Sequence, residues 1–94
     1  MDLEKLKHHL INYFRGDDLS LLLFGSRARG DHAPNSDIDI GIIPHKPLSP
    51  RKLTLLREWI EFQNIPQKVE FIDLSLVSEQ FKKEALRDAE WWKN

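Results

Sequence analysis

Residues 25–39 read GSRARGDHAPNSDID and follow directly on the apolar run LLLF at 21–24. The order is an apolar run, a Gly-Ser turn, a short basic segment and two aspartates one residue apart. The amides and the hydroxyl of a Gly-Ser turn can contact phosphate oxygens, and Asp37 and Asp39 can hold the divalent cations that accompany phosphates. The stretch therefore predicts a site for a nucleoside triphosphate.

The two aspartates open a pattern with a period of two residues. Residues 37–42 read DIDIGI, in which isoleucines alternate with acidic or small residues, as in a strand with one buried face. Asp37 and Asp39 then leave the same face, roughly 6.5–7 Å apart at the backbone. Two solvated carboxylates at the start of an edge strand are the simpler interpretation. The nearby Gly-Ser turn favours a Mg²⁺ site, in which two ions about 3.5–4 Å apart would suit displacement at phosphorus.

The Gly-Ser turn is expected between a strand over 19–24 and a short helix near 26–30. Gly25 has no Cβ, so its backbone can approach a phosphate closely. Ser26 is a natural N-cap, and the unpaired amides behind it form an anion site. For a Gly-Ser pair taken alone, an ordinary strand-to-helix turn is the better interpretation.

Two arginines of the short helix add positive charge beside this turn. Arg27 and Arg29 cannot be deprotonated in proteins, and we expect them to contact phosphate. Two other phosphate-binding motifs are excluded by the sequence. A P-loop would need Gly-Lys-Ser/Thr after the turn, and a dinucleotide fingerprint would need a third glycine besides Gly25 and Gly30.

Length and composition limit the remaining choices. Ninety-four residues are expected to form one domain over 1–94, with room for one core and none for a second substrate-binding lobe. A net charge of −1 gives no electrostatic basis for direct nucleic-acid binding. The absence of cysteine excludes disulfides and thiolate zinc sites. Because the sequence contains neither a signal peptide nor a bilayer-spanning apolar run, we expect a cytoplasmic protein without a membrane partner.

The rest of the chain predicts a scaffold of four helices and three strands. Asp2 caps a helix that Gly16 ends, Ser49 and Pro50 begin another, and Ser78 caps the last one. The three strands are expected near 19–24, 37–42 and 68–73. This order predicts an α/β domain with a small mixed sheet of about three strands and helices packed behind it.

Several aromatic residues have no obvious place in this scaffold. His8 and His9 lie off the apolar stripe of the first helix, so we expect them in solvent. Trp91 and Trp92 lie where chain ends usually fray. Either one of them folds back over the core, or they form an exposed apolar patch with Trp59 that marks a partner surface.

These elements together resemble a known signature. A Gly-Ser pair, a ten-residue spacer and Asp-x-Asp are similar to the motif of the DNA polymerase β-like nucleotidyltransferase superfamily. The short length and the form GSRARGD…SDID resemble the minimal nucleotidyltransferase (MNT) family of that superfamily. The resemblance covers most of the chain. It implies the nucleotidyltransferase fold and a metal site of the kind inferred above.

The resemblance also implies a third carboxylate on a later strand. Residues 68–73 read KVEFID, and Val69 and Phe71 are the likelier pair to pack inward, which leaves Glu70 on the more polar face. The family places an acidic residue early in this strand, although more usually Asp than Glu. Asp73 is the alternative, and its other role would be to cap the turn before the last helix. Glu70 is the preferred third metal ligand or general base.

The resemblance further implies an enzyme that transfers AMP from ATP, or another nucleoside monophosphate from its triphosphate, to a hydroxyl acceptor. MNT proteins pair with HEPN-domain proteins, often as antitoxins to HEPN ribonuclease toxins, and some add AMP to a tyrosine of the toxin. One alternative is a non-catalytic antitoxin that neutralises its partner by contact. Another is a small-molecule, aminoglycoside-type nucleotidyltransferase completed by a second chain. The acids at Asp37, Asp39 and Glu70 favour catalysis, and the short length disfavours the small-molecule enzyme.

Overall fold

Helices and strands alternate along the whole chain. The structure, a computed structural model, describes residues 2–31 and 33–94. The helices are α1 (Leu3–Tyr13), α2 (Ser26–Arg29), α3 (Pro50–Glu61) and α4 (Glu79–Arg87). The strands are β1 (Leu19–Phe24), β2 (Ile38–Pro44), β3 (Val69–Asp73) and β4 (Glu90–Lys93). The expected α/β class is confirmed, but the expectation of three strands is wrong, because the last residues of the chain form a fourth.

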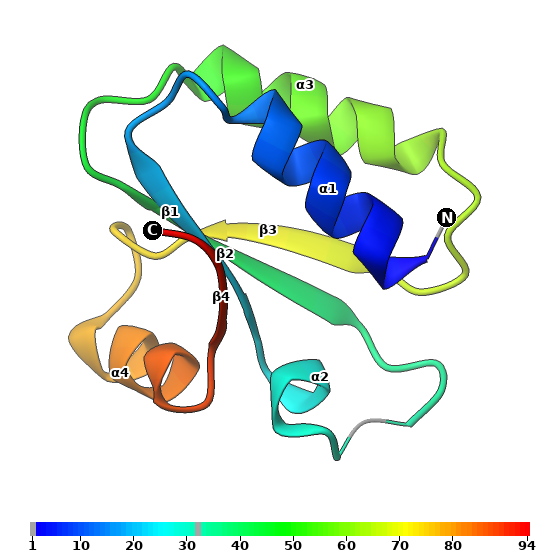
Figure 1. Cartoon of the computed structure of the whole chain (residues 1–94). Coiled ribbons are helices and arrows are strands. Elements are labelled where there is room, and N and C mark those ends of the chain that lie inside the picture. The colour runs from blue at the N-terminus through cyan, green and yellow to red at the C-terminus, as the bar shows by residue number, and fades with distance from the viewer. Residues whose placement is uncertain (1, 32) are drawn as a thin grey trace.

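The strands form one mixed sheet in the order β3-β2-β1-β4. β1 is antiparallel to both of its neighbours, and β2 is parallel to β3. Helices α1 and α3 pack on one face of this sheet and α4 packs on the other (Figure 1). All six residues of β1 are buried, as a central strand covered on both faces requires. Among the residues that the structure describes, none of the helices is long and apolar enough to cross a membrane.

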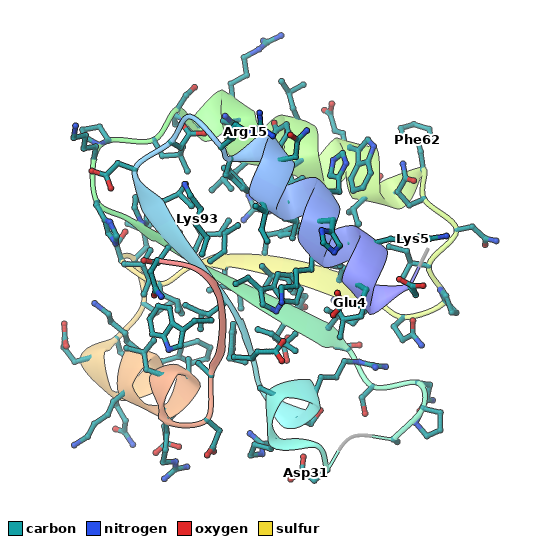
Figure 2. The ribbon with its side chains drawn as sticks, viewed as in Figure 1. Glu4, Lys5, Arg15, Asp31, Phe62 and Lys93 are labelled. Atoms are coloured by element: carbon teal, nitrogen blue, oxygen red, sulfur yellow. The ribbon has the colours of Figure 1, made fainter. Side chains whose placement is uncertain are left out.

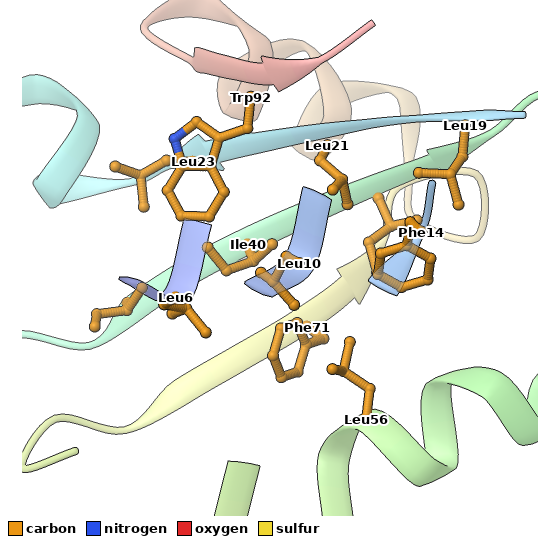
Figure 3. Packing of buried hydrophobic residues seen from close by; sticks show 12 residues of the cluster. Leu6, Leu10, Phe14, Leu19, Leu21, Leu23, Ile40, Leu56, Phe71 and Trp92 are labelled. Carbon is orange, nitrogen blue, oxygen red and sulfur yellow. The ribbon is translucent and has the colours of Figure 1, made fainter. Parts of the chain in front are cut away.

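The main core lies between the sheet and helices α1 and α3 (Figure 3). Leu6, Leu10 and Phe14 project from successive turns of α1 onto the sheet, and each is at most 1% exposed. The N-caps expected for the first and last helices are present. The side chain of Asp2 accepts a hydrogen bond from Lys5 N at 2.8 Å, and Ser78 Oγ accepts one from Phe81 N in the first turn of α4. α1 itself ends at Tyr13, earlier than the expected end at Gly16.

Strand β4 places the two adjacent tryptophans on opposite faces of the sheet. Trp92 is 7% exposed and packs among the α1 residues of the main core, and its indole N–H donates to Glu90 Oε2 at 2.7 Å. Trp91 is the register partner of Leu22 and stays 43% exposed on the α4 face. Lys93 closes the strand by donating to Phe14 O at 2.9 Å, near the end of α1 (Figure 2). One tryptophan therefore covers the core and the other stays at the surface.

A stacked aromatic pair joins α1 to α3. The ring of His9 lies 3.8 Å from the ring of Trp59, with an angle of 2° between the planes. The expectation that His9 is solvated is wrong, since it is half-buried in this stack, whereas His8 is exposed as expected. Trp59 is half-buried and packs against the main core, so it does not extend an exposed patch with Trp91. Phe62, one turn further on, is 86% exposed and points away from the molecule (Figure 2).

Candidate active site

The Gly-Ser turn joins the end of β1 to the short helix α2. Gly25 is the N-cap of this helix, with φ 77° and ψ −158°, and Ser26 is its first residue. The expectation that Ser26 is the N-cap is therefore wrong by one position. Gly25 O accepts from the amides of Ala28 and Arg29, both at 3.2 Å, which leaves the amides of Ser26 and Arg27 without an acceptor inside the helix. These two amides and the Ser26 hydroxyl are the groups that the turn offers to a phosphate.

A row of three residues crosses the sheet beside this turn. Phe24 on β1 is the register partner of Asp39 on β2, and Asp39 is in turn the partner of Glu70 on β3. Register partners project from the same face. Phe24 belongs to the smaller apolar cluster under α4, so Asp39 and Glu70 also project on the α4 side of the sheet. The strand register thus brings together two acids that lie 31 positions apart in the sequence.

The carboxylate of Asp39 lies directly beside the Cα of Gly25. A Cβ added to Gly25 would lie 2.5 Å from Asp39 Oδ2 and 3.4 Å from Asp39 Cγ. The carboxylate therefore occupies the space that any other residue at position 25 would need for its side chain. This contact keeps the Asp39 carboxylate beside the Gly-Ser turn. Gly25 is required here for its small size as well as for its positive φ.

The acids of the site repel one another electrostatically. Partial burial raises the pKa of Asp39, and the negative charges of Glu70 and Asp37 raise it further. Asp37 is exposed at the residue just before β2 begins, so it lies at the mouth of the site, and Asp39 is half-buried deeper in it. A carboxylate whose pKa is raised by two neighbouring negative charges is the electrostatic setting in which a divalent cation is stabilising.

Glu70 and Asp73 project from opposite faces of β3. Glu70 shares the face of Asp39, and its Oε1 forms an ion pair with Lys68 Nζ at 3.0 Å. This contact with Glu70 raises the pKa of Lys68. Asp73 lies on the face of Phe71, and its Oδ1 accepts from Ser75 N at 2.9 Å in the turn before α4. The geometry therefore brings Glu70 to Asp39 and assigns Asp73 the turn-capping role.

The two arginines of α2 have different surroundings. Arg27 Nε and Nη2 donate to Ser36 O at 3.2 and 3.0 Å, and Nη2 also donates to Pro34 O at 3.2 Å. Arg29 Nε donates to Asp31 Oδ2 at 3.2 Å in an exposed pair beside α2, whose position Figure 2 shows. Arg29 is therefore exposed near the turn, whereas the guanidinium of Arg27 is occupied by backbone carbonyls.

The donor set has the chemistry that Mg²⁺ prefers. Asp37, Asp39 and Glu70 offer carboxylate oxygens, and Mg²⁺ takes one or two carboxylates together with water and substrate phosphates. Within residues 2–31 and 33–94, no three acidic or histidine side chains converge closely enough to bind an ion by themselves. A metal held by Asp37 and Asp39 would therefore complete its coordination with nucleotide phosphates and water. The residues fit a substrate-assisted Mg²⁺ site.

Sequence reasoning missed three side chains that shape this site. Lys68 pairs with Glu70, and its place two residues before Glu70 on the same strand face was a usable signal. Ser36 closes a local turn within the segment before β2, and Gln67 contacts the same segment, as described below; nothing local in the sequence indicates the Gln67 contact.

The sequence matches a known protein family over most of its length. The family described as polymerase beta, nucleotidyltransferase matches residues 4–91. The chain belongs to this nucleotidyltransferase family. Members of the family generally use a divalent metal, in agreement with the carboxylate oxygens of the site.

A curated relative within the nucleotidyltransferases is the probable protein adenylyltransferase MntA of Haemophilus influenzae. It is 32% identical over 65 residues, which cover 69% of this chain and 57% of that protein. The chain thus matches little more than half of the relative's length.

Two solved structures share the nucleotidyltransferase fold. One is a toxin–antitoxin complex with AMP-PNP, with a TM-score of 0.64 and 22% identity over 92% of this chain and 71% of that one. The other is a complex of a tri-AMPylated Shewanella oneidensis HEPN toxin with an MNT antitoxin, with a TM-score of 0.61 and 18% identity over 95% of this chain and 70% of that one.

Proposed function

We propose that this chain is a Mg²⁺-dependent nucleotidyltransferase that transfers AMP from ATP to a hydroxyl group of a HEPN-type partner protein. The observation that carries the proposal is the contact of Asp39 with Gly25, with Glu70 as its neighbour on the next strand. This contact supports the proposal because carboxylates lie beside the Gly-Ser turn, whose unpaired amides and hydroxyl suit a phosphate. The relative named as a probable protein adenylyltransferase supports adenylyl transfer, and the toxin–antitoxin structures support the choice of partner.

Each residue of the site has a role in this reaction. Asp37 and Asp39 hold the metal, which when bound neutralises phosphate charge and orients the triphosphate. Ser26 and the first amides of α2 bind the outgoing phosphates, and Arg29 adds charge at the exposed rim. Asp37 and Asp39 would hold two such ions, with Glu70 as a further ligand or as the base. Fixed donors of this kind are worth most when charge develops in the transition state.

The transfer is an in-line displacement at the α-phosphorus. The acceptor oxygen forms the new O–P bond, the bond between the α-phosphorus and the bridging oxygen to the β-phosphate breaks, and pyrophosphate leaves. The proton of the acceptor hydroxyl passes to Glu70 or to water. Glu70 is half-exposed at the edge strand of the sheet, so an acceptor carried by another protein can reach it from solvent.

The partner is proposed to dock on the α4 face, beside the site. Trp91 is 43% exposed and Phe81 is 42% exposed on this face, and the ring of Phe81 lies 6.0 Å from that of Phe24, the neighbour of Asp39. Exposed aromatic residues are common binding anchors. Trp92 cannot serve in this way because it is buried. We expect Trp91→Ser to weaken the complex at least tenfold, and Phe62→Ser, at the end of α3, to leave its affinity unchanged.

Label transfer from α-³²P-ATP tests the proposal directly. The chain is incubated with Mg²⁺ and a candidate HEPN-type partner protein, and label is expected on that protein. Asp39→Asn should abolish the label, whereas Asp88→Asn, an exposed aspartate at the end of α4, should not. Neutralisation of the partner without label, and without any effect of Asp39→Asn, would show that the chain is a pure binding module.

A further inference from the structure

The segment that precedes Asp37 is held by a side chain from α2. Arg27 forms three hydrogen bonds with backbone carbonyls of this segment, two to Ser36 O and one to Pro34 O, at 3.0–3.2 Å. Arginine presents its N–H groups in a planar fork, so one guanidinium can reach two carbonyls at once. A phosphate would have to compete with these contacts for the same donors.

A second side chain holds the same segment from the opposite direction. Gln67, just before β3, donates from Nε2 to Pro34 O at 3.1 Å, so Pro34 O accepts from both Arg27 and Gln67. The segment also closes on itself, because Ser36 N donates to Ala33 O at 3.0 Å and Ala33 N donates to Ser36 Oγ at 2.9 Å. We call residues 33–36 the clamped turn.

The clamped turn is directly bonded to the first acid of the site. Ser36 O, the acceptor of two Arg27 hydrogen bonds, belongs to the peptide that precedes Asp37. On the other side, Ile38 N donates to Lys68 O at 2.8 Å. The backbone of Asp37 is thus fixed at both of its neighbours, although its own side chain is exposed.

We propose that Arg27 is a positioning residue that fixes Asp37 for metal binding through the clamped turn, and that it does not bind phosphate. This assignment replaces the phosphate-binding role expected for Arg27 from the sequence. It rests on the proposed function for the metal at Asp37, but the clamp itself is a property of the chain alone. Gln67 is the second side chain that holds the clamped turn, and its amide carries no charge with which to attract a phosphate.

Amide hydrogen exchange tests the clamp without any nucleotide or partner. Arg27→Met removes all of the donors, and Arg27→Lys keeps the charge but loses the fork. We expect exchange at Ser36 N to become at least tenfold faster in both variants and to rise by a smaller factor in Gln67→Leu. Arg51→Met, at an exposed arginine of α3, is the matched control and should leave exchange at Ser36 unchanged.

The Arg27→Lys variant separates the two roles. If Arg27 bound phosphate through its charge, Arg27→Lys would retain most of the nucleotide affinity and the amides of the clamped turn would exchange at their normal rate. Gln67→Leu would then leave nucleotide affinity unchanged. For a positioning residue, the Mg²⁺ concentration that gives half-maximal ATP binding should rise about tenfold in Arg27→Lys and less in Gln67→Leu. At saturating Mg²⁺, the ATP affinity of both variants should return to within twofold of the wild type.

Internal controls keep the outcome decisive. Exchange at Leu22 in the centre of β1 should stay slow in every variant, which shows that the fold is intact. Unchanged exchange at Ser36 in Arg27→Met would overturn the proposal whatever the enzyme does. Faster exchange together with a normal Mg²⁺ requirement would also overturn it, because the clamp would then be merely structural. If exchange and the Mg²⁺ requirement both rise but no AMP is transferred, the clamp stands and the proposed activity fails.

Discussion

Replacing Gly25 with alanine tests the contact on which the active site is built. The backbone of Gly25 has φ 77° and ψ −158°, a region that residues with a Cβ rarely adopt, and forcing one into it costs about 1–3 kcal/mol. The new Cβ would also lie 2.5 Å from Asp39 Oδ2, and overpacking of this kind costs about 1–3 kcal/mol more. Gly25→Ala should therefore lower the free energy of unfolding by about 2–6 kcal/mol, against a typical total of about 5–15 kcal/mol.

Two other glycines of the chain provide graded controls for this change. Gly30 has φ 80° but no heavy atom within 4 Å of an added Cβ, so Gly30→Ala should cost about 1–2 kcal/mol through backbone strain alone. Gly16 has neither a positive φ nor a close neighbour, and Gly16→Ala should stay within about 1 kcal/mol of the wild type. In an Asp39→Ala background, Gly25→Ala should lose the overpacking part of its cost and retain the strain.

Urea unfolding of these variants measures the differences directly, because the midpoint shifts at constant slope when only stability changes. A cost for Gly25→Ala no larger than that for Gly30→Ala would refute the contact between Gly25 and the Asp39 carboxylate. So would a Gly25→Ala cost that is the same with and without the Asp39 side chain, since residues in contact are not additive.

Three further predictions concern charge and chemistry. Mg²⁺ at ten times its Kd should raise the free energy of unfolding by about 1.4 kcal/mol, measured by urea unfolding, and Asp39→Asn should abolish this gain. Glu70→Gln should lower turnover about 10²-fold or more in the labelling assay while calorimetry shows little loss of ATP binding, and silencing by Asp73→Asn in its place would make Asp73 the third acid. Burial against Trp59 lowers the pKa of His9, so the unfolded chain binds the proton more tightly than the folded chain. The free energy of unfolding should therefore fall as the pH drops below about 6.5, and His9→Phe should reduce this loss in urea unfolding at several pH values.

The strand faces of the site's acids were predictable because apolar and polar residues alternate every two positions in these strands. The alternation in residues 37–42 and 68–73 places Asp39 and Glu70 on one face of their strands without knowledge of the fold. The structure adds the register, in which these two residues become direct neighbours. Register depends on the contacts of the whole sheet, so no local pattern could have given it. The roles of the site residues in binding and catalysis stay predictions.

The side chain of Arg27 shows why the remainder was not predictable. Its neighbours in sequence, a Gly-Ser turn and another arginine, indicate phosphate binding. Its contacts lie seven and nine positions away, on a turn whose path is fixed by Gln67 from the far side of β2. A long flexible side chain takes its role from the acceptors within its reach, and those are set by tertiary structure.

The fourth strand was missed for a related reason. Residues 90–93 read EWWK, which is too short for its alternation to be distinguished from a frayed helix end. It becomes a strand because β1 has a free edge on that side, and because Trp92 fills the core against α1 once the strand is paired. The same pairing requires Trp91 to face the α4 side, where Asp39 and Glu70 also lie. The element that completes the core therefore also carries the exposed aromatic residue to the face of the site, and a partner that docks on Trp91 would lie on the same face as the acids.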